Sequence, residues 1–126
     1  MKFEVDPKSP VPLHAQIAEM LRLAIARGTL RPRDQLPTVR QLSVDLKVNS
    51  NTVARVYAEL ERTGVVETFR GKGTFVRARP KVDSQAAHER RLRELCSNFI
   101  QACAREGFGL QEVHKALSSL GTEKKE

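Results

Sequence analysis

The stretch NSNTVARVYAEL, residues 49–60, constrains the fold more than any other part of the chain. Apolar residues recur in it at i, i+3, i+4 and i+7, which predicts a helix with one inward-packing face. They are Val53, Val56, Tyr57 and Leu60, and the polar residues before them are Asn49, Ser50, Asn51 and Thr52. This polar run can be read simply as a good helix start, capped by Asn49 or Ser50. Capping needs only one such residue, however, so four in a row indicate a second role.

Two further helices are expected before this one. Pro12 is well placed as a first helical residue, and an apolar stripe follows it up to Gly28, which ends the helix. The stripe comprises Leu13, Ile17, Met20, Leu21, Ala24 and Ile25. Residues 29–37 form a loop, after which Thr38 and Gln41 have the spacing of a capping box. A short helix of about two turns should follow, with an apolar side made of Val39, Leu42, Val44 and Leu46.

A β-hairpin is expected after the third helix, which should end at Gly64. In VVETFRGKGTFVRA, β-forming residues flank the turn sequence RGKG. Residues 79–84 are interpreted as a linker, 85–106 and 110–120 as two more helices, and TEKKE as a frayed tail. The fold class is therefore mainly α with a small β-hairpin wing, a winged helix-turn-helix followed by a C-terminal helical hairpin. The expected domains are residues 1–78, with the winged helix-turn-helix, and residues 85–126, with the last two helices.

The charge distribution favours a polyanionic partner. Residues 1–80 carry 14 Lys and Arg against 8 Asp and Glu, whereas residues 81–126 carry 8 against 7. The basic excess of +6 in the first part is typical of a nucleic-acid-binding domain, although a soluble protein can also simply be basic.

The polar start of the third helix is the predicted DNA-reading element. A recognition helix enters the major groove by its N-terminal end, where free N–H groups favour phosphate and Asn can pair with adenine. Arg40, near the start of the second helix, is expected to contact the DNA backbone. At the hairpin tip the glycines permit close approach and the cations meet phosphate or enter the minor groove. The predicted DNA-binding residues are Arg40, Asn49, Ser50, Asn51, Thr52, Arg55, Arg70, Gly71, Lys72 and Gly73.

These motifs together resemble the N-terminal domain of GntR-family bacterial transcription regulators. The resemblance covers roughly residues 10–78 and is carried by LPTVRQL, VNSNTVARVY, the ending Leu60–Gly64 and GKGTFV. It implies DNA contacts by Arg40, by the polar helix start and by the wing glycines with Lys72. The sequence departs from the family pattern at Arg33, where glycine is common, and at Ser50, where many members carry arginine. The wording NTVARVY and the short C-terminal part resemble the YtrA-like branch, whose members end in a two-helix dimerisation segment and tend to repress operons, often for transporters.

The fourth expected helix carries an apolar stripe suited to packing against another helix. It comprises Leu92, Leu95, Cys96, Phe99, Ile100 and Cys103. A helical hairpin alone would leave much of this stripe wet, so we expect a two-fold homodimer that binds a palindromic operator. The alternative is that the helix folds back on the winged domain. A redox or metal role for the two cysteines finds no support in CxxC or Cys/His spacing, and we expect no metal.

The predicted function is a sequence-specific DNA-binding transcription regulator, a dimeric repressor of its own or a transporter operon. The alternative is a winged-helix protein–protein adaptor without specific DNA binding. No catalytic constellation appears, so we expect no enzyme and no cofactor. No apolar run approaches the ~18 residues of a membrane span, which predicts a cytoplasmic protein without a membrane partner. A small-molecule effector could bind between the domains or at the dimer interface, but no residue cluster points to one.

Overall fold

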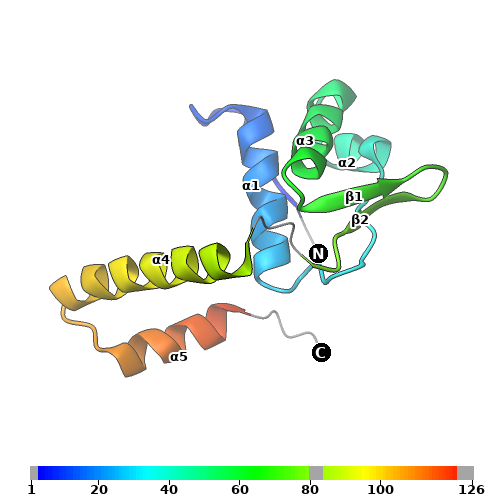
Figure 1. Ribbon diagram of the computed structural model, residues 1–126. Helices are drawn as coiled ribbons and strands as arrows, with labels where there is room; N and C mark the ends of the chain where they lie inside the picture. The colour runs from blue at the N-terminus through cyan, green and yellow to red at the C-terminus, as the bar shows by residue number, and fades with distance from the viewer. Residues whose placement is uncertain (1–2, 80–83, 122–126) are drawn as a thin grey trace. The chain divides into compact units, whose positions relative to one another are not determined.

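The computed structural model describes residues 3–79 and 84–121. The chain forms two compact units, Met1–Lys81 and Val82–Glu126. The predicted linker falls largely on residues 80–83 and the predicted tail on residues 122–126, which lie outside the described residues. The elements in order are α1 (Leu13–Ala26), α2 (Val39–Leu46), α3 (Ser50–Arg62), β1 (Val66–Phe69), β2 (Gly73–Val76), α4 (Gln85–Arg105) and α5 (Leu110–Gly121). The predicted fold class is confirmed: the described residues form five helices and one two-stranded antiparallel hairpin (Figure 1).

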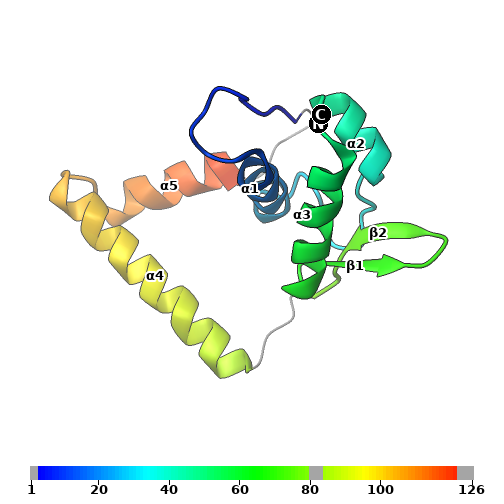
Figure 2. The same cartoon turned by 90° about the horizontal axis from the view of Figure 1, so that it is seen from above.

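The first unit is held together by an apolar core that all three of its helices and both strands share. The fully buried side chains include Ile17 of α1, Leu42 of α2, Leu60 of α3 and Val66 of β1. Burial of one such side chain stabilises the fold by about 1.5–3 kcal/mol. α3 packs on both α1 and α2, and the hairpin lies at its C-terminal end (Figures 1 and 2). The core therefore fixes α3 and the hairpin relative to each other.

Most helix boundaries agree with the sequence patterns, with two corrections. Helix α1 begins at Leu13 and Pro12 is its N-cap, one residue later than predicted. The Thr38 capping box is present, with both of its hydrogen bonds to Gln41. The prediction that Val44 belongs to the apolar side of α2 was wrong, since its side chain is 65% exposed. Val44 lies about 200° around the helix from Leu42, which the core does cover.

The hairpin pairs Val66 with Val76 and Phe69 with Gly73. A segment from the loop before α2, residues 33–36, runs along the other edge of β2 and forms an isolated antiparallel bridge there, with Gln35 opposite Phe75. Its backbone hydrogen bonds are Arg33 N to Val76 O at 2.9 Å, Val76 N to Asp34 O at 2.8 Å and Leu36 N to Thr74 O at 2.8 Å. This pairing ties the hairpin to the start of α2.

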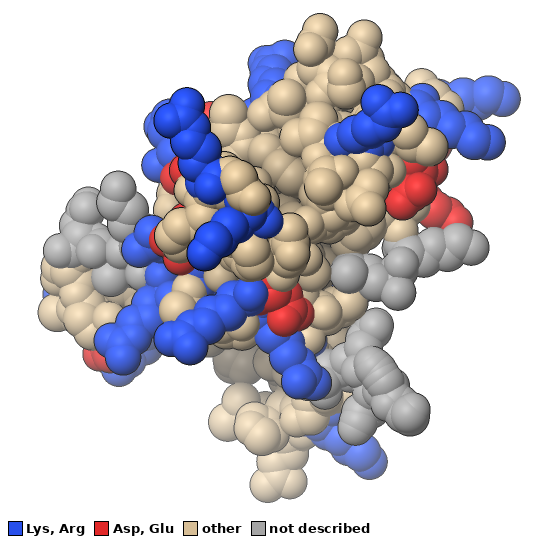
Figure 3. All heavy atoms as spheres, turned by 90° about the vertical axis from the view of Figure 1, so that its right-hand side faces the viewer, with Lys and Arg blue, Asp and Glu red and all other residues tan. Residues whose placement is uncertain are grey.

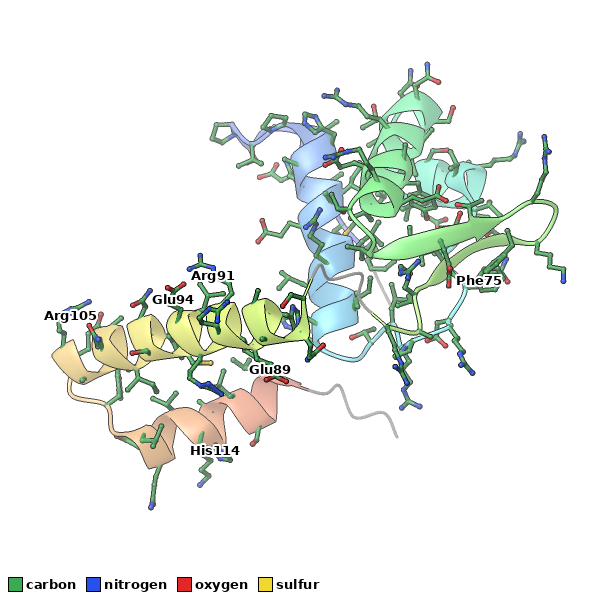
Figure 4. All side chains as sticks on the ribbon, in the orientation of Figure 1. Phe75, Glu89, Arg91, Glu94, Arg105 and His114 are labelled. Atoms are coloured by element: carbon green, nitrogen blue, oxygen red, sulfur yellow. The ribbon has the colours of Figure 1, made fainter. Side chains whose placement is uncertain are left out.

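The second unit consists of the antiparallel helices α4 and α5, which meet at their connection and diverge from it (Figure 2). No described residue of α4 is buried, and its apolar stripe is open: Leu92 is 57%, Leu95 48% and Phe99 48% exposed. Arg91 and Glu94 form a 2.6 Å ion pair on the outer side of α4 (Figure 4). Among the described helices, none is both long enough and apolar enough to cross a membrane.

Candidate nucleic-acid interface

In the N-terminal turn of α3, one polar side chain caps the helix and its neighbours do not, a distinction that the sequence left open. Asn49 is the N-cap, and its side-chain oxygen accepts a 2.7 Å hydrogen bond from the backbone N–H of Asn51. Ser50 and Asn51 are exposed and Thr52 is half-buried. Asn49 thus supplies the hydrogen-bond acceptor that the helix start needs, and the side chains of Ser50 and Asn51 are not needed for capping.

The outward face of α3 carries two arginines in different electrostatic settings. Arg62 donates two hydrogen bonds to the Glu59 carboxylate, the shorter at 2.6 Å, and this pairing holds the pKa of Glu59 below its ordinary value. Arg55 is exposed one turn from the helix start. Among the described side chains, no ion pair includes Arg55, so its charge is available to an external anion.

Arg40 is the second residue of α2, and its position is set by the capping box around Thr38. Its side chain is exposed, and none of the ion pairs found in residues 3–79 and 84–121 involves it. Its carbonyl oxygen accepts a 2.9 Å hydrogen bond from the Ser43 hydroxyl, which reinforces the first turn. The cation therefore projects from a rigid helix start.

The hairpin turn holds Arg70, Gly71 and Lys72, all exposed. The turn closes with a 2.8 Å bond from Lys72 N to Phe69 O, and Gly71 adopts φ 80°, a left-handed conformation that favours glycine. Gly73, half-buried, begins β2. We call residues 66–76 the wing. In both Figure 1 and Figure 2 the wing turn and α2 lie on the same side of α3.

Figure 3 shows the molecule from the right-hand side of Figure 1, where the wing turn lies. Lys and Arg side chains are spread over this view, with few Asp and Glu side chains among them. All ten sequence-predicted DNA-binding residues lie in the first unit, on α2, α3 and the wing. The arrangement offers a polar helix end for a groove and cations beside it for phosphates.

Sequence reasoning missed two polar side chains that hold these elements together. Tyr57, expected only as an apolar core residue, also donates a 2.6 Å hydrogen bond to the carbonyl oxygen of Pro37, and burial raises the pKa of its phenol above the ordinary value. A buried tyrosine hydroxyl usually finds a partner, so this signal was present in the sequence. Gln35 donates a 3.0 Å hydrogen bond to the carbonyl oxygen of Lys72 in the wing turn. No local pattern marks Gln35.

Comparisons with known proteins agree with this geometry. The family model described as "Bacterial regulatory proteins, gntR family" matches residues 13–76. The HTH-type transcriptional repressor YtrA of Bacillus subtilis is 30% identical over 98% of this chain and 95% of its own length. A solved structure titled as a transcriptional antiterminator from Listeria monocytogenes superposes over 100% of this chain and 98% of its own, with TM-score 0.65 and 27% identity. The AraR DNA-binding domain in complex with operator ORX1 matches 60% of this chain and 95% of its own, with TM-score 0.55 and 26% identity.

Proposed function

The chain belongs to the gntR family of bacterial regulatory proteins and is a DNA-binding transcription regulator, and on this premise we propose that it is a homodimeric repressor of a palindromic operator. The observation that carries the proposal is the exposed polar first turn of α3. Asn49 alone caps that helix, so Ser50 and Asn51 are left to face another molecule.

Base reading is assigned to the start of α3, the recognition helix, by Asn49, Ser50, Asn51, Thr52 and Arg55. Asn51 is the strongest candidate for a bidentate contact with adenine, since its side-chain oxygen and nitrogen are both uncommitted among the described hydrogen bonds. The Asn49 oxygen already serves the helix cap, which leaves its NH2 group to donate. Arg55 reaches a guanine or a phosphate one turn further along.

Phosphate contacts are assigned to Arg40 and to the wing residues Arg70, Gly71, Lys72 and Gly73. The supporting observation is that the three cations are exposed and take part in none of the ion pairs between described residues. Such contacts supply most of the sequence-independent affinity and fix the register of the protein on DNA. The AraR complex supports this use of the fold, because that domain is bound to operator DNA.

Residues 1–78 are proposed as the DNA-binding domain, 79–84 as a linker and 85–126 as the dimerisation segment. The support is the open apolar stripe of α4, which a single chain leaves in water. The stripe consists of Leu92, Leu95, Cys96, Phe99, Ile100 and Cys103. A second copy of the chain would bury this stripe, because in an isologous interface the same stripe of both subunits packs together. The dimer then places two recognition helices on half-sites of one palindrome.

Repression and the absence of catalysis are inferred from the relatives. The Bacillus subtilis relative that spans almost the whole chain is named a repressor, and the matching family consists of regulatory proteins. We therefore infer a non-enzymatic repressor of its own or a transporter operon, which works in the cytoplasm where bacterial DNA lies. A small-molecule effector remains possible in this proposal, which assigns no residues to one.

A gel shift with the full chain and the DNA upstream of its own gene tests the proposal, with excess nonspecific duplex at physiological salt. A discrete band that resists the competitor is the expected result for an autoregulating repressor. A smear that disappears with competitor contradicts an operator at that site. The matched control is the same DNA with its palindrome scrambled, which should shift no better than competitor.

A further inference from the structure

Gln35 makes a contact between two parts of the first unit that are far apart in the sequence. Its side-chain amide donates a 3.0 Å hydrogen bond to the carbonyl oxygen of Lys72, across 37 positions. The N–H of Lys72 is also engaged, because it closes the wing turn onto Phe69 at 2.8 Å. The backbone of Lys72 is therefore held on both sides, while its charged side chain is exposed.

Gly73 provides the space for this contact. A Cβ atom at position 73 would run into the amide nitrogen of Gln35, and the φ of 122° at Gly73 already disfavours other residues. Glycine at this position lets the Gln35 side chain lie directly against the wing backbone. A side chain at position 73 would therefore displace the Gln35 amide from this contact, and the positive φ favours glycine independently of any approach to DNA.

We propose that Gln35 is a positioning residue for DNA binding, whose amide fixes the wing turn so that Arg70 and Lys72 meet phosphate. The proposal rests on the wing contacts in the proposed function. Gln35 is suited to the task because the chain around it is fixed at both ends: it is paired with Phe75, and the next residue, Leu36, is 2% exposed. Only four residues separate Gln35 from Arg40, so one short segment links the wing turn to the start of α2.

The bond between Gln35 and Lys72 is solvent-exposed, and such bonds add little to global stability. Its removal should loosen the wing turn and leave the melting temperature unchanged. Gln35→Met is the informative variant, because methionine keeps the length of the side chain and removes the amide donor without adding charge. Gln101→Met is the matched control, since Gln101 is exposed on the side of α4 opposite the apolar stripe.

The first test needs no DNA. Backbone order parameters from NMR relaxation are measured for Lys72 and Gly73 in the wild type, Gln35→Met and Gln101→Met. We expect Gln35→Met alone to lower these two values from the rigid range near 0.85 towards the flexible range below about 0.6. Unchanged values in Gln35→Met would overturn the proposal, whatever the protein does with DNA.

The second test is a mutant cycle on DNA affinity with a nonspecific duplex, where phosphate contacts dominate. Gln35→Met should weaken binding by about threefold to tenfold. In a protein that already carries Arg70→Ala and Lys72→Ala, it should cause no further loss. An equal loss in both backgrounds would show that Gln35 acts elsewhere and would overturn the proposal. If the Arg70→Ala, Lys72→Ala protein binds as the wild type does, the wing contacts of the proposed function fail, and the order parameters separately report whether Gln35 holds the turn.

Discussion

The phenol hydroxyl of Tyr57 on the recognition helix donates a 2.6 Å hydrogen bond to the carbonyl oxygen of Pro37, just before α2. The side chain is 7% exposed, so α3 is bonded from within the core to the segment that leads to Arg40. This polar contact adds to the apolar packing between α2 and α3, and both help to fix the two helices in one geometry.

Removal of this hydroxyl should destabilise the first unit. Tyr57→Phe keeps the ring in the core and leaves the Pro37 carbonyl without its partner, so we expect a loss of about 1–2 kcal/mol in the free energy of unfolding. Urea denaturation followed by circular dichroism measures it, with Tyr57→Leu as a comparison that also removes ring packing. A midpoint equal to that of the wild type would contradict a stabilising role for the bond.

The same hydroxyl should make stability depend on alkaline pH. Burial raises the folded-state pKa of Tyr57 above the ordinary value near 10, so above that pH the unfolded chain loses the proton while the folded chain keeps it. The unfolded state then binds fewer protons, and the stability contribution present below about pH 10 is lost as the pH rises. The wild type should lose about 1 kcal/mol more than Tyr57→Phe between pH 9 and pH 11. A constant difference between the two proteins over that range would argue against this titration.

Arg40→Ala should weaken binding to all duplexes alike, because the arginine is assigned to phosphate. The slope of log K against log salt concentration should become shallower by about one unit, as expected for one lost phosphate contact. Fluorescence anisotropy titrations at several salt concentrations measure the slope. Arg105→Ala, in the last turn of α4, is the control and should leave the slope as it is. A wild-type slope in Arg40→Ala would remove Arg40 from the interface.

Phe99→Glu should dissociate the proposed dimer. It places a charge in the middle of the apolar stripe of α4, where a partner helix would have to desolvate it. Analytical ultracentrifugation should show the 14.2 kDa monomer for this variant and a species of twice that mass for the wild type. Gln101→Glu adds the same charge on the opposite side of α4 and should remain dimeric. A wild-type protein that sediments as a monomer at micromolar concentration would contradict the dimer itself.

The sequence predicted the elements whose signals are local. The buried face of α3, from Val53 to Leu60, follows from helical spacing, and the Thr38 capping box from two residues three positions apart. The strand-like pairing of residues 33–36 with β2 was missed, because it joins segments about forty positions apart and leaves no periodic signature in either. Val44 was misplaced because a two-turn helix offers too few positions to decide which apolar residue faces the core.

For the candidate site too, some features were predicted from local sequence and others required the structure. The polar run at residues 49–52 and the RGKG turn predicted the candidate surface from composition alone, and its contact with DNA stays a prediction. The role of Asn49 as the cap required the geometry, because Ser50 is chemically as suitable. Arg33 adopts φ 75°, a left-handed conformation that favours glycine, so the arginine that stands at this position carries backbone strain.

The central claim, that the start of α3 reads a palindromic sequence, is tested most directly by selection of bound duplexes from a random pool. The wild-type full chain and Asn51→Ala are compared at physiological salt. The account predicts that the wild type enriches a two-fold palindrome with half-sites one or more helical turns apart, and that Asn51→Ala loses the preference at one symmetric pair of positions. Enrichment of no sequence by the wild type, or of an identical motif by Asn51→Ala, would contradict it.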